Sequence, residues 1–428
     1  MTKEASDLLM PMSHPQRFSR QLSLAALVKF GYAVKSSYWF VPLILTVLAI
    51  ILAYLSVWLD AEMGIPASFL PSALTDTAPS GARAVMSVVA GAVIGTTGVM
   101  CSLTLVAVSF ASSQYGPRLI GNFMGDHGTQ WSLGILIATF VYSVIVLKAI
   151  EGSDGVDTGI FIPHFSVFLA LVLMLISVGA MIYFIHHVPE TINVSKLVAG
   201  IGHRLETAIR EEMESPPPTM AREGRPADPL KVSICLNQTG YLQSLDLTRL
   251  SHIARQIDCD AWLLVSPGAF VTRIDHVMEL RGIEDISSDL EARIQACFAL
   301  GDAPTVEQNP TFFARQLSEV ATRALSPGVN DPYTAIECVH RIQAALELAI
   351  SYGPGVHDSD VGPMGLRRLS FKTLLDNSYE LIMPYAVSDT LVRSEIARGL
   401  RRLSEMTEDS AHQSHIKRLS DRAANPNS

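Results

Sequence analysis

The most informative absence in this 428-residue sequence is that of aspartate and glutamate from four long apolar runs. The runs cover about 39–59, 84–111, 131–150 and 161–184, and their only strongly charged residue is Lys148, near one end. Because roughly 20 apolar helical residues cross a bilayer, each run predicts a transmembrane helix. Transporters coupled to protons or sodium commonly need carboxylates or other dedicated ion sites in the membrane, so this class is disfavoured. The absence does not disfavour a passive pore, whose selectivity would be set by hydroxyls and backbone carbonyls.

Familiar catalytic motifs are missing as well. The sequence has no G-x-x-x-x-G-K-[ST], H-E-x-x-H, G-x-S-x-G or G-x-G-x-x-G. We therefore predict no enzyme, catalytic residue, cofactor or metal site, although a tethered enzyme with an unrecognised site stays open as a third alternative. The net charge of −9 and the lack of a concentrated basic segment argue against a nucleic-acid partner.

The cysteines form no C-x-x-C pair and are widely spaced. One lies in the second apolar run and four lie after the runs, where we expect thiols to stay reduced. We predict that all five pack in cores: Cys101, Cys235, Cys259, Cys297 and Cys338.

Basic residues flank the apolar runs mainly on one side, which predicts the orientation of the chain, because translocation of Lys and Arg is disfavoured. The side that holds both termini carries Lys3, Arg17, Arg20, Lys29, Lys35, Arg118, Lys196 and Arg204. The opposite flanks carry Arg83 among several acidic residues. Both termini are therefore expected in the cytoplasm, and no cleavable signal peptide is expected before the first run.

The second run carries a stripe of small residues along one predicted helix face. Ser87, Gly91, Gly95, Gly98, Ser102 and Ser109 recur at steps of three, four or seven. In a membrane such a stripe indicates either close contact between helices or a water-lined passage. Gly95, Thr96, Thr97 and Gly98 also predict a local weakening of the helix near mid-depth, where an unwound backbone would bind or conduct an ion.

The second run ends in SFASSQYGPRLIGNF, residues 109–123. Tyr115, Gly116 and Pro117 are expected to break the helix at the cytoplasmic boundary, and Arg118 is the strong cation there. One interpretation makes Gln114, Tyr115, Pro117 and Arg118 a cytoplasmic gate or a coupling point to the soluble part. The alternative is a stop signal with an interface anchor.

The patterns divide the chain into six parts. Residues 1–38 form a cytoplasmic segment, whose residues 16–35 suit either an interfacial helix or an extension of the first span. The four-helix transmembrane domain, 39–187, is followed by a helical extension and Pro-rich linker at 188–229. A small α+β module is expected at 230–275, a helical cytoplasmic domain at 276–411 and a flexible tail at 412–428.

The sharpest string of the soluble part is RALSPGVNDPYTAIE, residues 323–337. Asp331 is expected to cap a helix that begins at Pro332, which an αα-hairpin explains by itself. The functional alternative makes Ser326, Asn330 and Asp331 part of a polar pocket or subunit contact. Pro267 and Gly268 read first as a tight turn.

SFASSQYGPRLIGNF and RALSPGVNDPYTA, with GYLQSLD at 240–246 and SPGAFV at 266–271, resemble segments of a bacterial family of predicted inner-membrane proteins, domain of unknown function 2254. The resemblance covers nearly the whole chain. It implies inner-membrane residence and this domain layout, and it assigns no substrate, cofactor or catalytic residue. Val329 and Tyr333 stand where we expect Ile and Phe, which are changes at the level of packing.

Together these observations predict four transmembrane helices plus a cytoplasmic α+β domain dominated by helices, assembled as a homo-oligomer in the bilayer. The function expected is a passive channel for inorganic ions, lined by the second span. The alternative is a membrane-anchored scaffold or sensor whose cytoplasmic domain binds a partner or small ligand.

Overall fold

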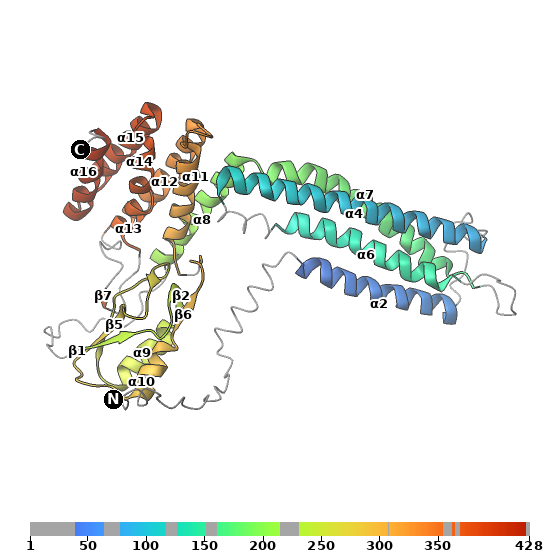
Figure 1. Ribbon diagram of the computed structural model, residues 1–428, viewed down its shortest axis with the longest axis horizontal. Helices are drawn as coiled ribbons and strands as arrows, with labels where there is room; N and C mark the ends of the chain where they lie inside the picture. Colours follow the sequence, from blue (N-terminus) through green and yellow to red (C-terminus); the bar gives the residue numbers. More distant parts are fainter. Residues whose placement is uncertain are drawn as a thin grey trace, which may run out of the picture. The chain divides into compact units, whose positions relative to one another are not determined.

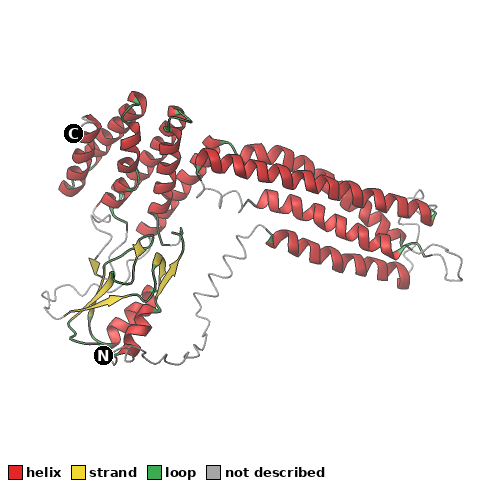
Figure 2. Ribbon diagram, in the orientation of Figure 1, coloured by secondary structure: helices red, strands yellow, loops and turns green. Residues whose placement is uncertain are grey.

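The computed structural model describes residues 39–63, 78–116, 126–150, 161–214, 231–306, 308–353, 362–363 and 369–424. These residues are mostly helical, with a few short strands (Figures 1 and 2). The chain divides into two compact units. The first comprises Met1–Gly98 and Met124–Met181, and the second comprises Val99–Phe123 and Ile182–Ser428. The expected N-terminal segment, 1–38, lies outside the described residues.

Among the described residues, four helices are long and apolar enough to cross a membrane: α2 (Phe40–Met63), α4 (Pro79–Tyr115), α6 (His127–Ala149) and α7 (His164–Thr191). The four predicted spans are thus present, but α4 and α7 extend beyond their expected ends. With 37 residues, α4 is about 55 Å long at 1.5 Å per residue. That length exceeds the hydrocarbon thickness of roughly 30 Å, so part of α4 can lie outside the bilayer.

In the first unit, α2 and α6 approach closely because Gly134 has no side chain. A Cβ atom placed there would lie 2.7 Å from Leu45 Cδ1 and 3.2 Å from Pro42 Cα. Further along, the hydroxyl of buried Tyr142 lies 2.8 Å from Ser56 Oγ and donates to the Ser166 carbonyl at 3.1 Å. Tyr142 therefore joins α2, α6 and α7 through one polar group.

The carboxylate of Asp60, near the end of α2, caps the first turn of α7. It accepts hydrogen bonds from the backbone of Phe165 at 3.1 Å and of Ser166 at 2.9 Å, and from Ser166 Oγ at 2.7 Å. The first N–H groups of a helix have no partner within that helix, so this acidic side chain supplies one from a neighbouring helix.

Most of the second unit is helical. One apolar core is shared by the helices α8 (Val194–Glu214), α11 (Thr311–Ala324), α12 (Pro332–Ser351), α13 (Phe371–Asp376), α14 (Tyr379–Ala386), α15 (Thr390–Met406) and α16 (Ser410–Ala424). The helical extension predicted after the fourth span is interrupted after α7, where Asn193 Oδ1 accepts the backbone N–H of Lys196 at 3.2 Å and starts α8.

The flexible tail expected from residue 412 is instead the helix α16. Its polar composition suggested fraying, yet His412, Ile416, Leu419 and Ala423 recur every three or four residues and are buried. That spacing places them on one helix face, which packs against the core of the second unit.

The strands form two small antiparallel sheets in the order β1-β5-β3-β7 and β4-β2-β6. They are β1 (Lys231–Cys235), β2 (Gly240–Leu245), β3 (Asp260–Leu263), β4 (Phe270–Val271), β5 (His276–Arg281), β6 (Phe298–Gly301) and β7 (Gly362–Pro363), with the helices α9 (Leu247–Gln256) and α10 (Ser288–Gln295). The register places Ile234 opposite Met278 and Ala261 opposite Leu280.

The expected boundary at residue 275 therefore cuts through the α+β module. Strand β5 follows this boundary and pairs with both β1 and β3. Residues 276–411 were predicted to form a helical domain, but Phe298–Gly301 within them form strand β6 beside β2. Cys259 and Cys297 are buried in this module and Cys338 in the helical core, whereas Cys101 is exposed and Cys235 is half-buried. The prediction of core packing is wrong for the last two.

Candidate functional site

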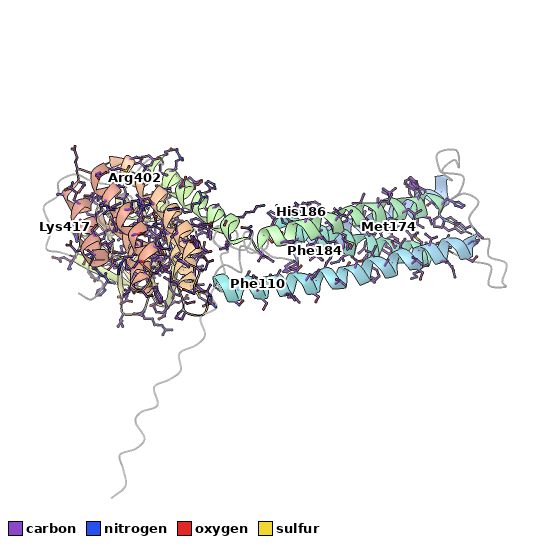
Figure 3. All side chains as sticks on the ribbon, turned by 90° about the horizontal axis from the view of Figure 1, so that it is seen from above. Phe110, Met174, Phe184, His186, Arg402 and Lys417 are labelled. Carbon is purple, nitrogen blue, oxygen red and sulfur yellow. The ribbon has the colours of Figure 1, made fainter. Side chains whose placement is uncertain are left out.

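The small-residue stripe of α4 lies on an open face of the chain. All six of its residues, Ser87, Gly91, Gly95, Gly98, Ser102 and Ser109, are exposed. A Cβ atom added to any of the three glycines would meet no atom within 4 Å. The opposite face of the same helix is buried, at Met86, Val93 and Met100. The stripe is therefore not used for packing within the described chain. Phe110, which directly follows the last stripe residue on α4, is also exposed (Figure 3).

The helix is continuous through Gly95 and Gly98, so the expected local unwinding is absent. Thr97 donates its hydroxyl hydrogen bond to the Val93 carbonyl at 2.7 Å, one turn earlier in the same helix. Its exposed fraction is 4%, which places Thr97 on the buried face. Of the two roles predicted for Thr97, pore lining or helix packing, its burial fits packing, and its own helix satisfies its hydroxyl.

Helix α4 runs past the predicted end of the span at residue 111 and ends at the helix break that the sequence predicted. Tyr115 is the last helical residue, and Gly116 follows with φ at +109°, a left-handed conformation that glycine adopts without strain. The other predicted gate residues are not tested here. Gln114 lies in the last turn, but its side chain and that of Tyr115 are outside the described residues, as are Pro117 and Arg118 entirely.

Two α11 residues that the sequence analysis did not assign contact this end of α4. Arg323 donates to the carbonyl of Ser113, from Nε at 2.8 Å and also from Nη2. Glu319 Oε1 lies 3.0 Å from the position that a Cβ on Gly116 would occupy. Glu319 and Arg323 are four residues apart on an amphipathic helix, so they share a face. The spacing of four residues could have shown that they share a face, but nothing in the sequence indicated which element this face contacts.

The turn between α11 and α12 has the structure of an αα-hairpin. Asp331 caps α12 by accepting the backbone N–H of Thr334 at 3.1 Å and its hydroxyl at 2.6 Å, and Pro332 takes the first position. The Ser326 carbonyl accepts the backbone N–H of Asn330 at 2.9 Å, and Asn330 has a left-handed φ of +50°. The predicted cap is confirmed. Ser326, Asn330 and Asp331 do not line the cavity of the second unit that is described next.

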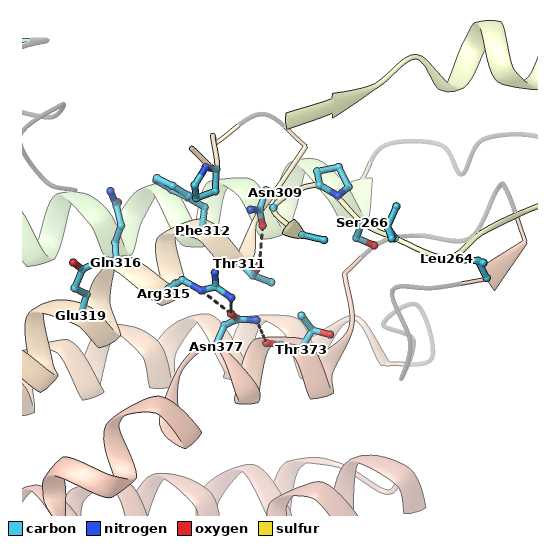
Figure 4. Close-up of a pocket in the computed structure, with 15 residues that line it drawn as sticks. Leu264, Ser266, Asn309, Thr311, Phe312, Arg315, Gln316, Glu319, Thr373 and Asn377 are labelled. Carbon is cyan, nitrogen blue, oxygen red and sulfur yellow. Dashed lines mark hydrogen bonds between the residues drawn. The ribbon is translucent and has the colours of Figure 1, made fainter. Parts of the chain in front are cut away.

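A cavity of about 280 Å³ lies in the second unit, between the loop after β3 and helix α11 (Figure 4). Its wall comprises Leu264, Val265, Ser266, Pro267, Gly268, Ala269, Pro304, Asn309, Thr311, Phe312, Arg315, Gln316, Glu319, Thr373 and Asn377. The four helical residues from Phe312 to Glu319 occur at spacings of three, one and three, which puts them on one face of α11. The sequence analysis treated Pro267 and Gly268 as a turn and did not predict the cavity.

Side-chain hydrogen bonds hold the polar part of this wall in place. Arg315 donates to Asn377 Oδ1 from Nε at 3.0 Å and from Nη2 at 2.6 Å, and Asn377 Nδ2 donates to the Thr373 carbonyl at 2.8 Å (Figure 4). On the other side, the Thr311 hydroxyl donates to Asn309 Oδ1 at 2.8 Å. The guanidinium and both amides therefore have fixed orientations.

A residue with a side chain would be disfavoured at Gly268, where the loop approaches Asn309, for two reasons. Its φ of +94° is one that a side chain disfavours, and a Cβ there would overlap Asn309 Nδ2. Gln316 differs from its neighbours because its side chain is 4% exposed and Oε1 receives no hydrogen bond from any residue that the structure describes. The wall thus combines apolar groups, one cation, one carboxylate and a buried acceptor without a donor.

Comparisons with known proteins support the membrane assignment and leave function open. The family described as "predicted membrane protein (DUF2254)" matches residues 35–402. Uncharacterised proteins of Mycobacterium bovis and Mycobacterium tuberculosis are each 34% identical over 282 residues, which covers 62% of this chain and 52% of the relative. The matched region thus spans about half the length of these curated relatives. No solved structure matches the chain.

Proposed function

We propose that this chain, which belongs to the DUF2254 family of predicted membrane proteins, assembles as a homo-oligomer around a passive ion pore lined by α4. It is a multi-pass membrane protein, with four helices that can cross a bilayer. In our proposal the membrane is the bacterial inner membrane, both termini and the soluble part lie in the cytoplasm, and the soluble part regulates conduction. The excess of Lys and Arg in the flanks on one side supports this orientation.

The open stripe of α4 is the observation that carries the proposal. Apolar residues of one α4 face are buried within the described part of the chain, while the six glycine and serine positions on the other face are exposed there. Glycine gives lipid tails little side-chain contact, and serine hydroxyls are poorly matched to hydrocarbon. Another copy of the chain, water, or both would match this face better than lipid.

The length of the stripe favours a pore over a local contact between helices. From Ser87 to Ser109 the stripe rises about 33 Å along the helix, which is comparable to the hydrocarbon thickness. A packing motif needs only two or three small residues at a crossing point. Leu105 and Val106, both strongly exposed, interrupt the stripe and would form a hydrophobic constriction that gates by dewetting.

Ion flux into liposomes tests the lining. Gly98→Leu and Ser102→Leu should reduce flux through the reconstituted protein severalfold, because each places a bulky side chain on the stripe. Leu103→Phe is the matched control, since Leu103 is exposed beside Ser102 but lies about 100° around the helix from it. Unchanged flux in both stripe variants would remove the lining assignment. A strictly monomeric protein by light scattering in detergent would remove the oligomer as well.

The cavity beside α11 favours a second candidate, a membrane-anchored scaffold or sensor without conduction. In that case the four helices hold the soluble part at the membrane, and the soluble part binds a partner or a small ligand. Purified full-length protein that conducts no ions in planar bilayers and still binds a small molecule would favour the sensor over the pore.

A further inference from the structure

We propose that the cavity between the Ser266–Ala269 loop and α11 binds a free amino acid, a small zwitterion with an ammonium and a carboxylate group. A concave, mainly apolar wall with a few fixed polar groups is the usual form of a small-ligand site. With about 280 Å³, this cavity suits a small metabolite better than a nucleotide or a peptide. A sensor role for this cavity rests on the second candidate function proposed above. Ligand binding itself does not depend on whether α4 conducts ions.

Gln316 points to the donor that the ligand must carry. Its side chain is nine-tenths buried, it lines the cavity, and its Oε1 accepts no hydrogen bond within the part of the chain that the structure describes. Buried polar atoms in native proteins are nearly always satisfied, because an acceptor that has lost water and gained no donor is unfavourable. Oε1 is itself enclosed, so the side-chain amide would turn about its last bond to meet an ammonium N–H of a ligand in the cavity, which would supply that donor.

The charges on the same helix face indicate the rest of the ligand. Arg315 comes directly before Gln316 on α11, and Glu319 lies one turn after Arg315. A guanidinium and a carboxylate therefore flank the buried amide. Asn377 fixes the guanidinium through two hydrogen bonds, which orients it for planar recognition of a carboxylate. An anionic ligand with several charges is disfavoured, because the wall has one cation and Glu319 opposes it. A zwitterion matches both charges.

Occupancy of the cavity would be transmitted along α11. Glu319 lines the cavity and also lies against Gly116, and Arg323, one turn further along α11, holds the Ser113 carbonyl. The same helix therefore contacts the ligand site and the end of α4. Only this coupling step rests on the proposed pore.

Binding is tested with the full-length protein in detergent, using each standard L-amino acid as the probe in calorimetry and thermal-shift measurements. At least one should bind, and its N-acetyl derivative, which lacks the ammonium, and its amide, which lacks the carboxylate, should each bind at least tenfold more weakly. If no amino acid binds, or if the N-acetyl derivative binds equally well, the proposal is wrong.

Gln316 variants separate binding from folding. Gln316→Leu should weaken binding at least tenfold while the melting temperature stays the same or rises, because the change removes a buried acceptor that lacks a donor. Gln316→Glu keeps an acceptor for the ammonium and should retain binding. Gln256→Leu, an exposed position away from the cavity, should change nothing. Equal affinity of the Gln316→Leu variant would contradict the site.

The coupling has its own readout. The amino acid that binds should change ion flux of the wild-type chain in liposomes, and Arg323→Ala should keep the affinity and lose that response. Binding without any effect on flux would overturn the coupling and leave the site in place. A protein that conducts no ions but binds the amino acid would overturn the pore alone.

Discussion

Arg323 on α11 donates from two guanidinium nitrogens to the backbone carbonyl of Ser113, in the last turn of α4. The last carbonyls of a helix lack intrahelical partners, and the helix dipole favours a cation at that end. The same helix α11 lines the cavity, so one rigid element touches the end of a candidate membrane span and a candidate ligand site. This contact is the structural basis of the proposed coupling between the cavity and α4.

Replacing Arg323 with alanine should loosen the end of α4 without unfolding the second unit. Because the contact is exposed, we expect it to contribute about 1 kcal/mol or less to local stability. Hydrogen exchange should therefore accelerate by up to about fivefold at residues 111–116. Arg398→Ala is the control, since exposed Arg398 pairs with Glu395 on its own helix, α15. Unchanged exchange at the end of α4 would show that the contact has no role in solution.

Two glycines of the candidate spans should respond oppositely to alanine. Gly134→Ala forces a methyl group against Leu45 and the Pro42 backbone, so we expect a loss of about 1–3 kcal/mol from overpacking. Gly91→Ala meets no atom within 4 Å, and the higher helix propensity of alanine should leave stability equal or slightly raised. Thermal unfolding of both variants in detergent measures the difference. Equal melting temperatures would contradict the close approach of α2 and α6.

The sequence was most informative where one local pattern determines one element. Long apolar runs without Asp or Glu predicted the four membrane helices. Asp331 with Pro332 predicted the start of α12, because capping is local. Elements that depend on distant partners were missed. Strand β6 is short and is stabilised by pairing with β2, so it was missed within a region predicted to be helical. The cavity was missed for the same reason, since Gly268 meets Asn309 only after the fold has formed.

The cysteines should differ strongly in their reactivity at pH 8. Burial raises the pKa of the Cys259 and Cys297 thiols to about 11, so roughly one molecule in a thousand carries either thiolate at that pH. Burial also raises the pKa of Cys338 far above the usual range. Half-buried Cys235 should be alkylated by iodoacetamide well before these three. Mass spectrometry of the labelled native protein measures the order, and early labelling of Cys338 would contradict the packing of α12.

Glu279 should make the α+β module sensitive to acid. On β5, its carboxylate accepts hydrogen bonds from Lys231 and Arg281, which in that order lower its pKa below the ordinary value of 4.5. Arg281 also stacks 3.8 Å from the ring centre of Trp262, so the carboxylate ties β1, β5 and β3 together.

Because the folded pKa is the lower one, the carboxylate stabilises the fold above the unfolded pKa, and this contribution is lost as the pH falls through the folded pKa. Glu279→Gln should therefore lower the melting temperature at pH 7, and the gap to wild type should close as the pH falls below 4.5. Glu284→Gln, an exposed carboxylate of the same module, should show no such gap. A gap for Glu279→Gln that persists at low pH would mean that the glutamine disturbs packing rather than removing a charge, because protonated glutamate and glutamine are then nearly equivalent in charge and shape.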